Sequence, residues 1–245
     1  MSIDVVDLRD FYHGRLGQVA RHMIGRRVRA LWPDVRGMRV LGLGYATPYL
    51  GPYLAEAERV AAVMPAQQGV LRWPVEGPNR ACLAEEGELP LPDFSVDRVL
   101  LVHGLEFSEQ VRPLLKEIWR VLAGGGRLIV AVPNRRGIWT RFDNTPFGQG
   151  SPYTTGQLSH LLREEGFTPE RNAPALFVPP TYSRFILRLA PLLESLGTRW
   201  FGAFGGVVMV EATKQIYAKP QAERALKKRR AVLLPMPGTP SPAGG

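Results

Sequence analysis

The sequence has little cysteine and histidine and no long apolar run. Cys82 is the single cysteine among 245 residues, which excludes a disulfide framework. The four histidines form no cluster with zinc-ligand spacing, so we predict no metal site. No apolar run approaches the roughly 18 residues of a membrane span. The first ten residues also lack the basic and then apolar order of a signal peptide. We therefore expect a cytoplasmic protein without a membrane span.

The positive charge of the chain is concentrated at its two ends. The net charge is +9, of which residues 1–39 contribute eight Arg against four Asp, and residues 211–245 contribute seven basic against two acidic residues. The residues between them sum to zero, whereas a nucleic-acid site should line a face of the folded domain. This distribution argues against nucleic acid as a partner and favours a small-molecule acceptor or a protein partner.

Three regions are predicted from composition and pattern. Apolar residues at helical spacing between Phe11 and Trp32 predict an amphipathic helix, and we expect residues 1–35 to cover the site of the following domain. Residues 36–218 should form that domain, with residues 177–204 as a helical insertion before its last strand. Residues 219–245 are basic and rich in Pro and Gly, a composition typical of a disordered tail.

Strand and helix patterns alternate within the central region. Short buried-type strands are predicted at residues 38–43, 59–64, 98–103 and 127–132, helices at 111–122, 154–165 and 183–196, and an antiparallel edge strand at 206–217. This alternation indicates a doubly wound α/β sheet, mostly parallel, with an antiparallel last strand.

A glycine turn follows the first strand. Gly42 and Gly44 allow a sharp turn and a close backbone approach to a ligand. A dinucleotide fingerprint would need a third glycine where the chain has Thr47, so NAD or FAD binding loses support.

Segments downstream of this turn carry a more specific pattern. Glu85 to Val99 reads EEGELPLPDFSVDRV, and it is followed by VHGLE at 102–106, LKEIWRVLAGGG at 115–126 and VAVPN at 130–134. This succession resembles the type 11 family of S-adenosylmethionine-dependent methyltransferases, over roughly residues 38–134. The resemblance implies a Rossmann-like methyltransferase fold, S-adenosylmethionine as cofactor, and methyl transfer to a small or moderately apolar acceptor.

The resemblance also implies the positions that contact the cofactor. It assigns Gly42, Gly44 and Tyr45 of the turn to the methionine part of the cofactor, and Glu85 and Glu86 to the adenine. It assigns the end of the 98–103 strand to the sulfonium side, with His103, Gly104, Leu105 and Glu106. It assigns Met64, at the end of the 59–64 strand, to the ribose.

Two departures from the family pattern leave a second interpretation open. The family has an acid where this chain has Met64, and Tyr45 is bulkier than the small residues that the family has in this turn. A lost charge-assisted hydrogen bond costs about 1.5–3 kcal/mol. The chain could therefore be an active methyltransferase, or a non-catalytic protein that keeps the fold as a binding or assembly module. A nucleic-acid-modifying enzyme is a third hypothesis, based on the basic ends alone.

Few catalytic side chains are expected, because methyl transfer depends mainly on proximity and orientation and needs at most one base. His103 is a candidate because ligands bind where parallel strands end. Asp143 and Tyr153 are candidates from the loop 134–153, which could shape the acceptor pocket. Tyr12 and Arg21 could cap the cofactor's carboxylate. For all five residues a role in packing or on the surface is the alternative.

Overall fold

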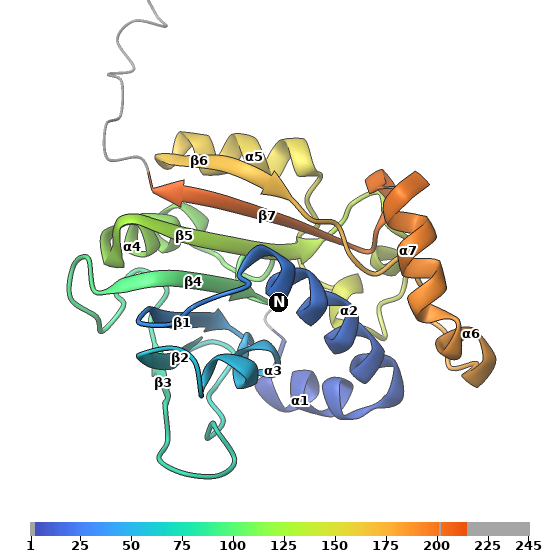
Figure 1. Cartoon of the computed structure of the whole chain (residues 1–245), viewed down its shortest axis with the longest axis horizontal. Helices are drawn as coiled ribbons and strands as arrows, with labels where there is room; N and C mark the ends of the chain where they lie inside the picture. Colours follow the sequence, from blue (N-terminus) through green and yellow to red (C-terminus); the bar gives the residue numbers. More distant parts are fainter. Residues whose placement is uncertain (1–2, 201, 215–245) are drawn as a thin grey trace, which may run out of the picture.

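A seven-stranded mixed sheet forms the centre of the protein (Figure 1), as seen in a computed structural model that describes residues 3–200 and 202–214. Its strand order is β3-β2-β1-β4-β5-β7-β6. The first five strands pair in parallel, and β7 runs antiparallel to both of its neighbours. The predicted fold class, a mostly parallel doubly wound sheet with an antiparallel last strand, is confirmed. The strands are β1 (Arg39–Gly44), β2 (Arg59–Pro65), β3 (Ala81–Ala84), β4 (Val96–Val102), β5 (Leu122–Pro133), β6 (Phe167–Asn172) and β7 (Val207–Lys214).

Helices cover both faces of the sheet. They are α1 (Val5–His13), α2 (Arg15–Leu31), α3 (Thr47–Leu50), α4 (Val111–Val121), α5 (Thr155–Glu164), α6 (Arg184–Arg188) and α7 (Ala190–Trp200). Side chains alternate along a strand, so Leu100 and Val102 of β4 join the core beneath α1 and α2. Val99 and Leu101 join the core beneath α4 and α5. This pattern explains why the strands read as continuous apolar runs.

Short 3₁₀ helices complete the connections. They are η1 (Gly51–Tyr53), η2 (Ile138–Arg141), η3 (Pro146–Gly148) and η4 (Gly202–Phe204). None of the helices in the described part of the chain is long and apolar enough to cross a membrane.

The N-terminal region forms two helices where one was predicted. The side chain of Asp4 accepts a hydrogen bond from Val6 N at 2.7 Å and caps α1, which begins earlier than expected. Gly14 is extended and ends α1 before α2 begins. A Cβ at Gly17 would overlap the backbone of Phe11, so glycine permits the close return of α2 over α1.

The last strand is interior, and the prediction that it lies at an edge was wrong. β7 pairs with β5 and β6, so β6 is the edge strand. Its carboxylate, Glu211, is fully buried and accepts hydrogen bonds from Trp32 Nε1 at 3.0 Å, Arg127 at 3.2 Å and Arg171 at 2.5 Å. A buried carboxylate needs such partners. The alternation of apolar and polar residues in β7 therefore does not mark an exposed face, because its acid, Glu211, is buried with arginine partners.

Two further elements differ from the sequence pattern. The strand β3 was not predicted, because its four residues include the exposed Cys82 and no clear periodicity. The single helix predicted at 183–196 is divided into α6 and α7 at Leu189. The tail predicted at 219–245 lies outside the described residues.

Candidate functional site

A narrow cleft lies where the parallel strands β1, β2, β3 and β4 end. The strand order reverses at β1, which is where ligands bind in open α/β sheets. Apolar side chains make up most of the lining, together with two glycines and two glutamates. The lining residues are Leu43, Gly44, Val63, Pro65, Ala84, Glu85, Glu86, Leu89, Leu101, Gly104 and Leu114.

Two glycines bring the ends of β1 and β4 into backbone contact. Gly44 has a φ of +67°, and a Cβ there would overlap Val102 O and lie 2.9 Å from Gly104 N. Only glycine satisfies both conditions. Gly42 does not line the cleft: a Cβ at Gly42 would lie 2.5 Å from Leu50 Cδ1, on the face covered by α3. Of the two predicted glycines, only Gly44 therefore borders the cleft.

The two acids predicted at the adenine position border the cleft in different ways. Glu86 is buried and accepts a hydrogen bond from Ser108 Oγ at 2.6 Å. Glu85 is exposed at the rim. The chemistry of this lining suits a flat heterocycle that carries an exocyclic amine, because apolar side chains can contact the ring and a carboxylate can accept from the amine. The cleft itself has a free volume of only about 10 Å³, so its walls would have to separate to admit such a ring.

The position expected to meet the ribose is apolar and inaccessible. Met64 is buried in the core beneath α1 and α2, and its neighbour Pro65 is the residue that borders the cleft. The loop that follows contains Gln68, which sequence reasoning missed. Its side-chain amide donates to His103 O at 2.6 Å, and its backbone carbonyl accepts from Val5 N at 2.8 Å. Gln68 thus joins the ends of β2 and β4 to the start of α1.

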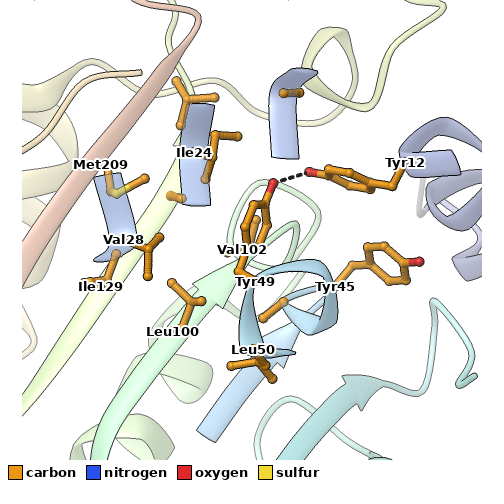
Figure 2. Packing of buried hydrophobic residues seen from close by; sticks show 14 of the residues in the cluster. Tyr12, Ile24, Val28, Tyr45, Tyr49, Leu50, Leu100, Val102, Ile129 and Met209 are labelled. Atoms are coloured by element: carbon orange, nitrogen blue, oxygen red, sulfur yellow. Dashed lines mark hydrogen bonds between the residues drawn. The ribbon is translucent and has the colours of Figure 1, made fainter. Parts of the chain in front are cut away.

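A buried network of polar aromatic side chains lies beside the cleft. Tyr12 Oη on α1 is 2.7 Å from Tyr49 Oη on α3 and 2.7 Å from His103 Nε2 at the end of β4. His103 Nδ1 is 3.1 Å from Glu106 Oε1. Figure 2 shows Tyr12 and Tyr49 pointing toward each other, with Tyr45 next to Tyr12. The rings of Tyr12 and Tyr45 stack at a centroid distance of 5.7 Å.

Burial keeps the phenols of this network protonated. Burial raises the pKa of Tyr12 and of Tyr49 well above the ordinary tyrosine value, so both phenols keep their protons. One arrangement that satisfies every pair has Tyr49 donating to Tyr12, Tyr12 donating to His103 Nε2, and His103 Nδ1 donating to Glu106. His103 Nε2 is occupied as long as Tyr12 stays in place.

One oxygen of the network has no partner. Glu106 Oε2 is buried without a hydrogen-bond partner in the described part of the chain. An unpaired carboxylate oxygen in the interior is costly and therefore suited to a donor or a positive charge that arrives with a ligand. His103, next to it, has a φ of 49°, an uncommon conformation for a non-glycine residue and one concentrated at functional sites.

The loop 134–153 forms a second cavity on the other side of this network. Phe147 from this loop lies 4.9 Å from the His103 ring and 6.0 Å from the Phe11 ring, measured between centroids. The cavity beyond Phe11 measures about 380 Å³. Its lining residues are Ile3, Asp7, Asp10, Phe11, Gly14, Arg15, Leu16, Asn144, Thr145, Pro146, Gln149 and Tyr182.

The remaining predicted residues lie outside both cavities. Asp143 is exposed, and its neighbour Asn144 lines the second cavity in its stead. Tyr153 is half-buried against the core beneath α4 and α5, where burial raises its pKa. Leu105 is buried in the same core. Arg21 is exposed and donates to Pro48 O at 2.9 Å, so it anchors α2 to α3.

Sequence reasoning found this edge of the sheet but not all of its residues. Tyr12 was a candidate, and the structure brings it together with His103 and Glu106. Tyr49, Gln68 and Phe147 were missed. The aromatic residues of the loop were a usable signal for Phe147, whereas nothing in the sequence distinguishes Gln68 from an ordinary polar loop residue.

The fold and the cleft together define the class of protein. The strand order, the antiparallel β7 and a cleft above β1 and β4 are those of a class I S-adenosylmethionine-dependent methyltransferase fold. Residues 41–130 match the family model described as a methyltransferase domain of type 11. The chain therefore carries a type 11 methyltransferase domain, and S-adenosylmethionine is supported as its cofactor.

Solved structures with this fold are distant in sequence. A methyltransferase from Thermotoga maritima, described as a possible histamine N-methyltransferase, is 20% identical, with a TM-score of 0.60 over 86% of this chain and 96% of that one. A methyltransferase of Haloferax volcanii, solved in complex with the Trm112 methyltransferase activator, is 14% identical, with a TM-score of 0.60 over 86% and 99%. A methyltransferase from Archaeoglobus fulgidus is 20% identical, with a TM-score of 0.55 over 79% and 94%. No curated protein sequence matches the chain significantly.

Proposed function

We propose that this protein transfers a methyl group from S-adenosylmethionine to a small or moderately apolar acceptor. The observation that carries the proposal is the cleft at the carboxyl edge of β1–β4, with its Gly44–Gly104 contact and with Glu85 and Glu86 in its lining. When bound, the cofactor supplies the methyl group for an in-line displacement. The protein contributes binding, orientation and the exclusion of water.

The adenine end of the cofactor would enter the cleft, which has a free volume of only about 10 Å³ and would have to widen to admit the ring. Leu43, Val63 and Leu101 would contact the ring, and Glu85 would accept a hydrogen bond from its amine. Glu86 is held by Ser108 and would add negative potential beneath the ring. The ribose would lie near Pro65 without an acid, which predicts weaker binding than a charge-assisted contact would provide.

The methionine end would lie beside the buried network. The unpaired oxygen of Glu106 is suited to the positive charge of the sulfonium or of the amino group. Tyr12 and Tyr45 fill the space next to it, so we infer that α1 moves when the cofactor enters. A displaced Tyr12 would free His103 Nε2 to accept the acceptor's proton, with Glu106 holding the imidazole in the required tautomer.

The acceptor would occupy the cavity between α1 and the loop 134–153. Phe11, Leu16 and Pro146 give it an apolar lining, and Asp7 and Asp10 lie at its rim. Phe147 lies 4.9 Å from the His103 ring, so it would have to move together with Tyr12 before the acceptor could reach His103. An acceptor with an apolar body and a basic or hydroxyl group matches this lining. Asp143 and Tyr153 are not needed in this arrangement.

A non-catalytic binding module is the second candidate. Two observations favour it: Met64 replaces the ribose acid, and Tyr12, Gln68 and Tyr45 close the space between the ends of β2 and β4. Such a protein would bind the cofactor or its product, or neither, without turnover.

Calorimetric titration with S-adenosylmethionine and S-adenosylhomocysteine tests the proposal. We expect both to bind, and Glu85→Ala to weaken binding by about 10- to 150-fold through the lost adenine contact. Glu88→Ala is the matched control, because Glu88 is exposed and does not line the cleft. Absence of heat with either compound at millimolar concentration would exclude cofactor-dependent function. Binding without transfer of a labelled methyl group to any extracted small molecule would favour the binding module.

A further inference from the structure

Helix α7 presents three of its four large apolar residues to solvent, while Leu193 packs against the core. Leu192, Leu196 and Trp200 follow one another at intervals of four, which places them on one side of the helix, and all three are exposed. The inner side carries Ala190, Glu194 and Gly197. This is the reverse of a surface helix of a soluble protein, whose apolar stripe faces the core.

The only acid of the segment is turned inward. Glu194 is buried and accepts hydrogen bonds from Leu176 N at 3.2 Å and Phe177 N at 2.9 Å. A Cβ at Gly197 would overlap the ring of Phe177, so this face is tightly packed. The orientation of α7 is therefore determined by specific contacts of its inner face, which leave the apolar side outward.

Further exposed aromatic residues extend the apolar surface on both sides of α7. Phe185 on α6 is 72% exposed and Trp200 is 71% exposed. Tyr182 precedes α6 and Phe204 follows α7, and both are exposed. We call these residues the α6–α7 face: Tyr182, Phe185, Leu192, Leu196, Trp200 and Phe204. Exposed apolar residues concentrated on one segment in this way are typical of an interaction site.

Basic residues border the α6–α7 face. Arg184, Arg188 and Arg199 are exposed on the same two helices, and Arg15 and Arg26 are exposed on the adjacent α2. None of these five takes part in an ion pair with another described residue, whereas Arg27 and Arg29 do. A groove of about 540 Å³ between α2 and α6 is lined by Arg15, Arg184 and Arg188 together with apolar side chains.

The α6–α7 face lies at the same edge of the sheet as the cleft. β6 is parallel to β5 because both pair antiparallel with β7, so the connection from β6 to β7 leaves at the edge where β1 and β4 end. Figure 1 shows α6 and α7 at the periphery of this side of the molecule. Tyr182 belongs both to the face and to the lining of the second cavity.

We propose that the α6–α7 face docks on an anionic lipid surface, with its Trp, Phe and Leu side chains at the acyl boundary and its arginines among the headgroups. Exposed aromatic and aliphatic side chains framed by arginine match the two halves of a membrane interface. A protein partner would need no such cationic frame, and a polyanion would leave the apolar side chains in water. The docking goes beyond methyl transfer and requires no cofactor.

Vesicle flotation of the full-length protein tests the proposal. We expect the protein to float with vesicles of phosphatidylcholine and phosphatidylglycerol, more weakly with phosphatidylcholine alone, and less as salt is raised. The double variant Leu192→Ser, Leu196→Ser should lose most of this binding, and its exposed sites leave the fold intact. Arg184→Glu with Arg188→Glu should weaken it by about tenfold or more.

Matched controls lie outside the α6–α7 face. Val75→Ser removes an exposed apolar residue, and Arg36→Glu with Arg59→Glu reverses two exposed arginines elsewhere. Both controls should bind as the wild type does. Trp200 gives a direct signal, because its emission should shift to the blue and be quenched by brominated lipid, and Trp200→Phe should remove this signal while binding persists.

Three results would overturn the docking proposal. One is flotation that is unchanged in the Leu192, Leu196 variant, which would assign membrane binding to another part of the chain, such as the basic residues 227–230. Another is absence of flotation together with a dimer in sedimentation that the same variant dissociates, which would make the face a contact between two copies. The third is absence of both, which would leave a protein partner. None of these results bears on cofactor binding, so the proposed function is tested separately.

Discussion

Tyr12 Oη lies 2.7 Å from His103 Nε2 and joins the first helix to the end of β4. The contact is buried, and it closes the carboxyl edge of the sheet at the point where a ligand would meet His103. Because Gln68 also ties the start of α1 to His103 O, the helix is held at two places. The position of α1 and the accessibility of His103 are therefore coupled.

Removing the Tyr12 hydroxyl should destabilise the fold. Tyr12→Phe leaves His103 Nε2 and Tyr49 without a buried partner, so we expect the free energy of unfolding to fall by about 1–3 kcal/mol in urea titrations. Tyr182→Phe is the control, since Tyr182 is exposed. An unchanged midpoint for Tyr12→Phe would mean that water replaces the hydroxyl and that the helix is not held by this contact.

Alkaline pH should unfold the protein cooperatively. Burial raises the pKa of Tyr12, Tyr45 and Tyr49, and it raises the pKa of Tyr53 to about 12. The folded state holds these protons more tightly than the unfolded state, whose tyrosines titrate near about 10. The stabilisation is complete below that pH and is lost as the pH rises above it. Urea titrations at about pH 9 and about pH 11 should show the fall, with a smaller fall for Tyr12→Phe; an equal fall would exclude Tyr12 as a contributor.

Alanine substitutions at two glycines with the same φ angle should distinguish the cost of backbone strain from the cost of steric overlap. Gly44 and Gly37 both have a φ of +67°, but a Cβ at Gly37 meets nothing within 4 Å, whereas one at Gly44 overlaps Val102 O. Gly37→Ala should cost about 1–2 kcal/mol of stability from the left-handed conformation alone. Gly44→Ala should cost clearly more, measured by thermal unfolding of both variants. Equal losses would contradict the close contact between the ends of β1 and β4.

Restoring an acid at Met64 should not restore a ribose contact. Met64 is almost fully buried in the core beneath α1 and α2, so Met64→Asp would bury an unpaired carboxylate and lower the free energy of unfolding by about 3 kcal/mol or more. Met64→Leu keeps the volume and should cost less than about 1.5 kcal/mol. A stable Met64→Asp protein with tighter cofactor binding would show that this position reaches the ribose.

The sequence predicted the sheet well because buried strands and glycine stops are local signals. The runs at 98–103 and 127–132 correspond to β4 and β5. The placement of β7 was mispredicted because Glu211 resembles the polar position of an exposed strand, and its neutralisation by Trp32, Arg127 and Arg171 is a tertiary effect. The break at Gly14 was missed because the apolar spacing continues across it.

The candidate site was predicted only at the level of strand ends. The succession of motifs indicated Glu85, Glu86 and the segment from His103 to Glu106, and their surroundings are now described. It could not indicate which partners would surround His103, because Tyr12 and Tyr49 lie 91 and 54 residues earlier in the chain, on two separate helices. We predict that the residues around the cleft and His103 bind the cofactor, and the calorimetric titrations test this prediction.

The long connection between β6 and β7 separates the residues that hold the sheet together from the residues that could contact a partner surface. β6 and β7 keep their antiparallel register, and Ala175 still pairs with Val207 before the chain continues into α6 and α7. The buried residues Ala175, Leu176 and Val178 belong to the core, whereas the large side chains of the α6–α7 face lie outside it. Exchanging only those exposed side chains should therefore redirect where the protein docks without altering the glycine contact between β1 and β4.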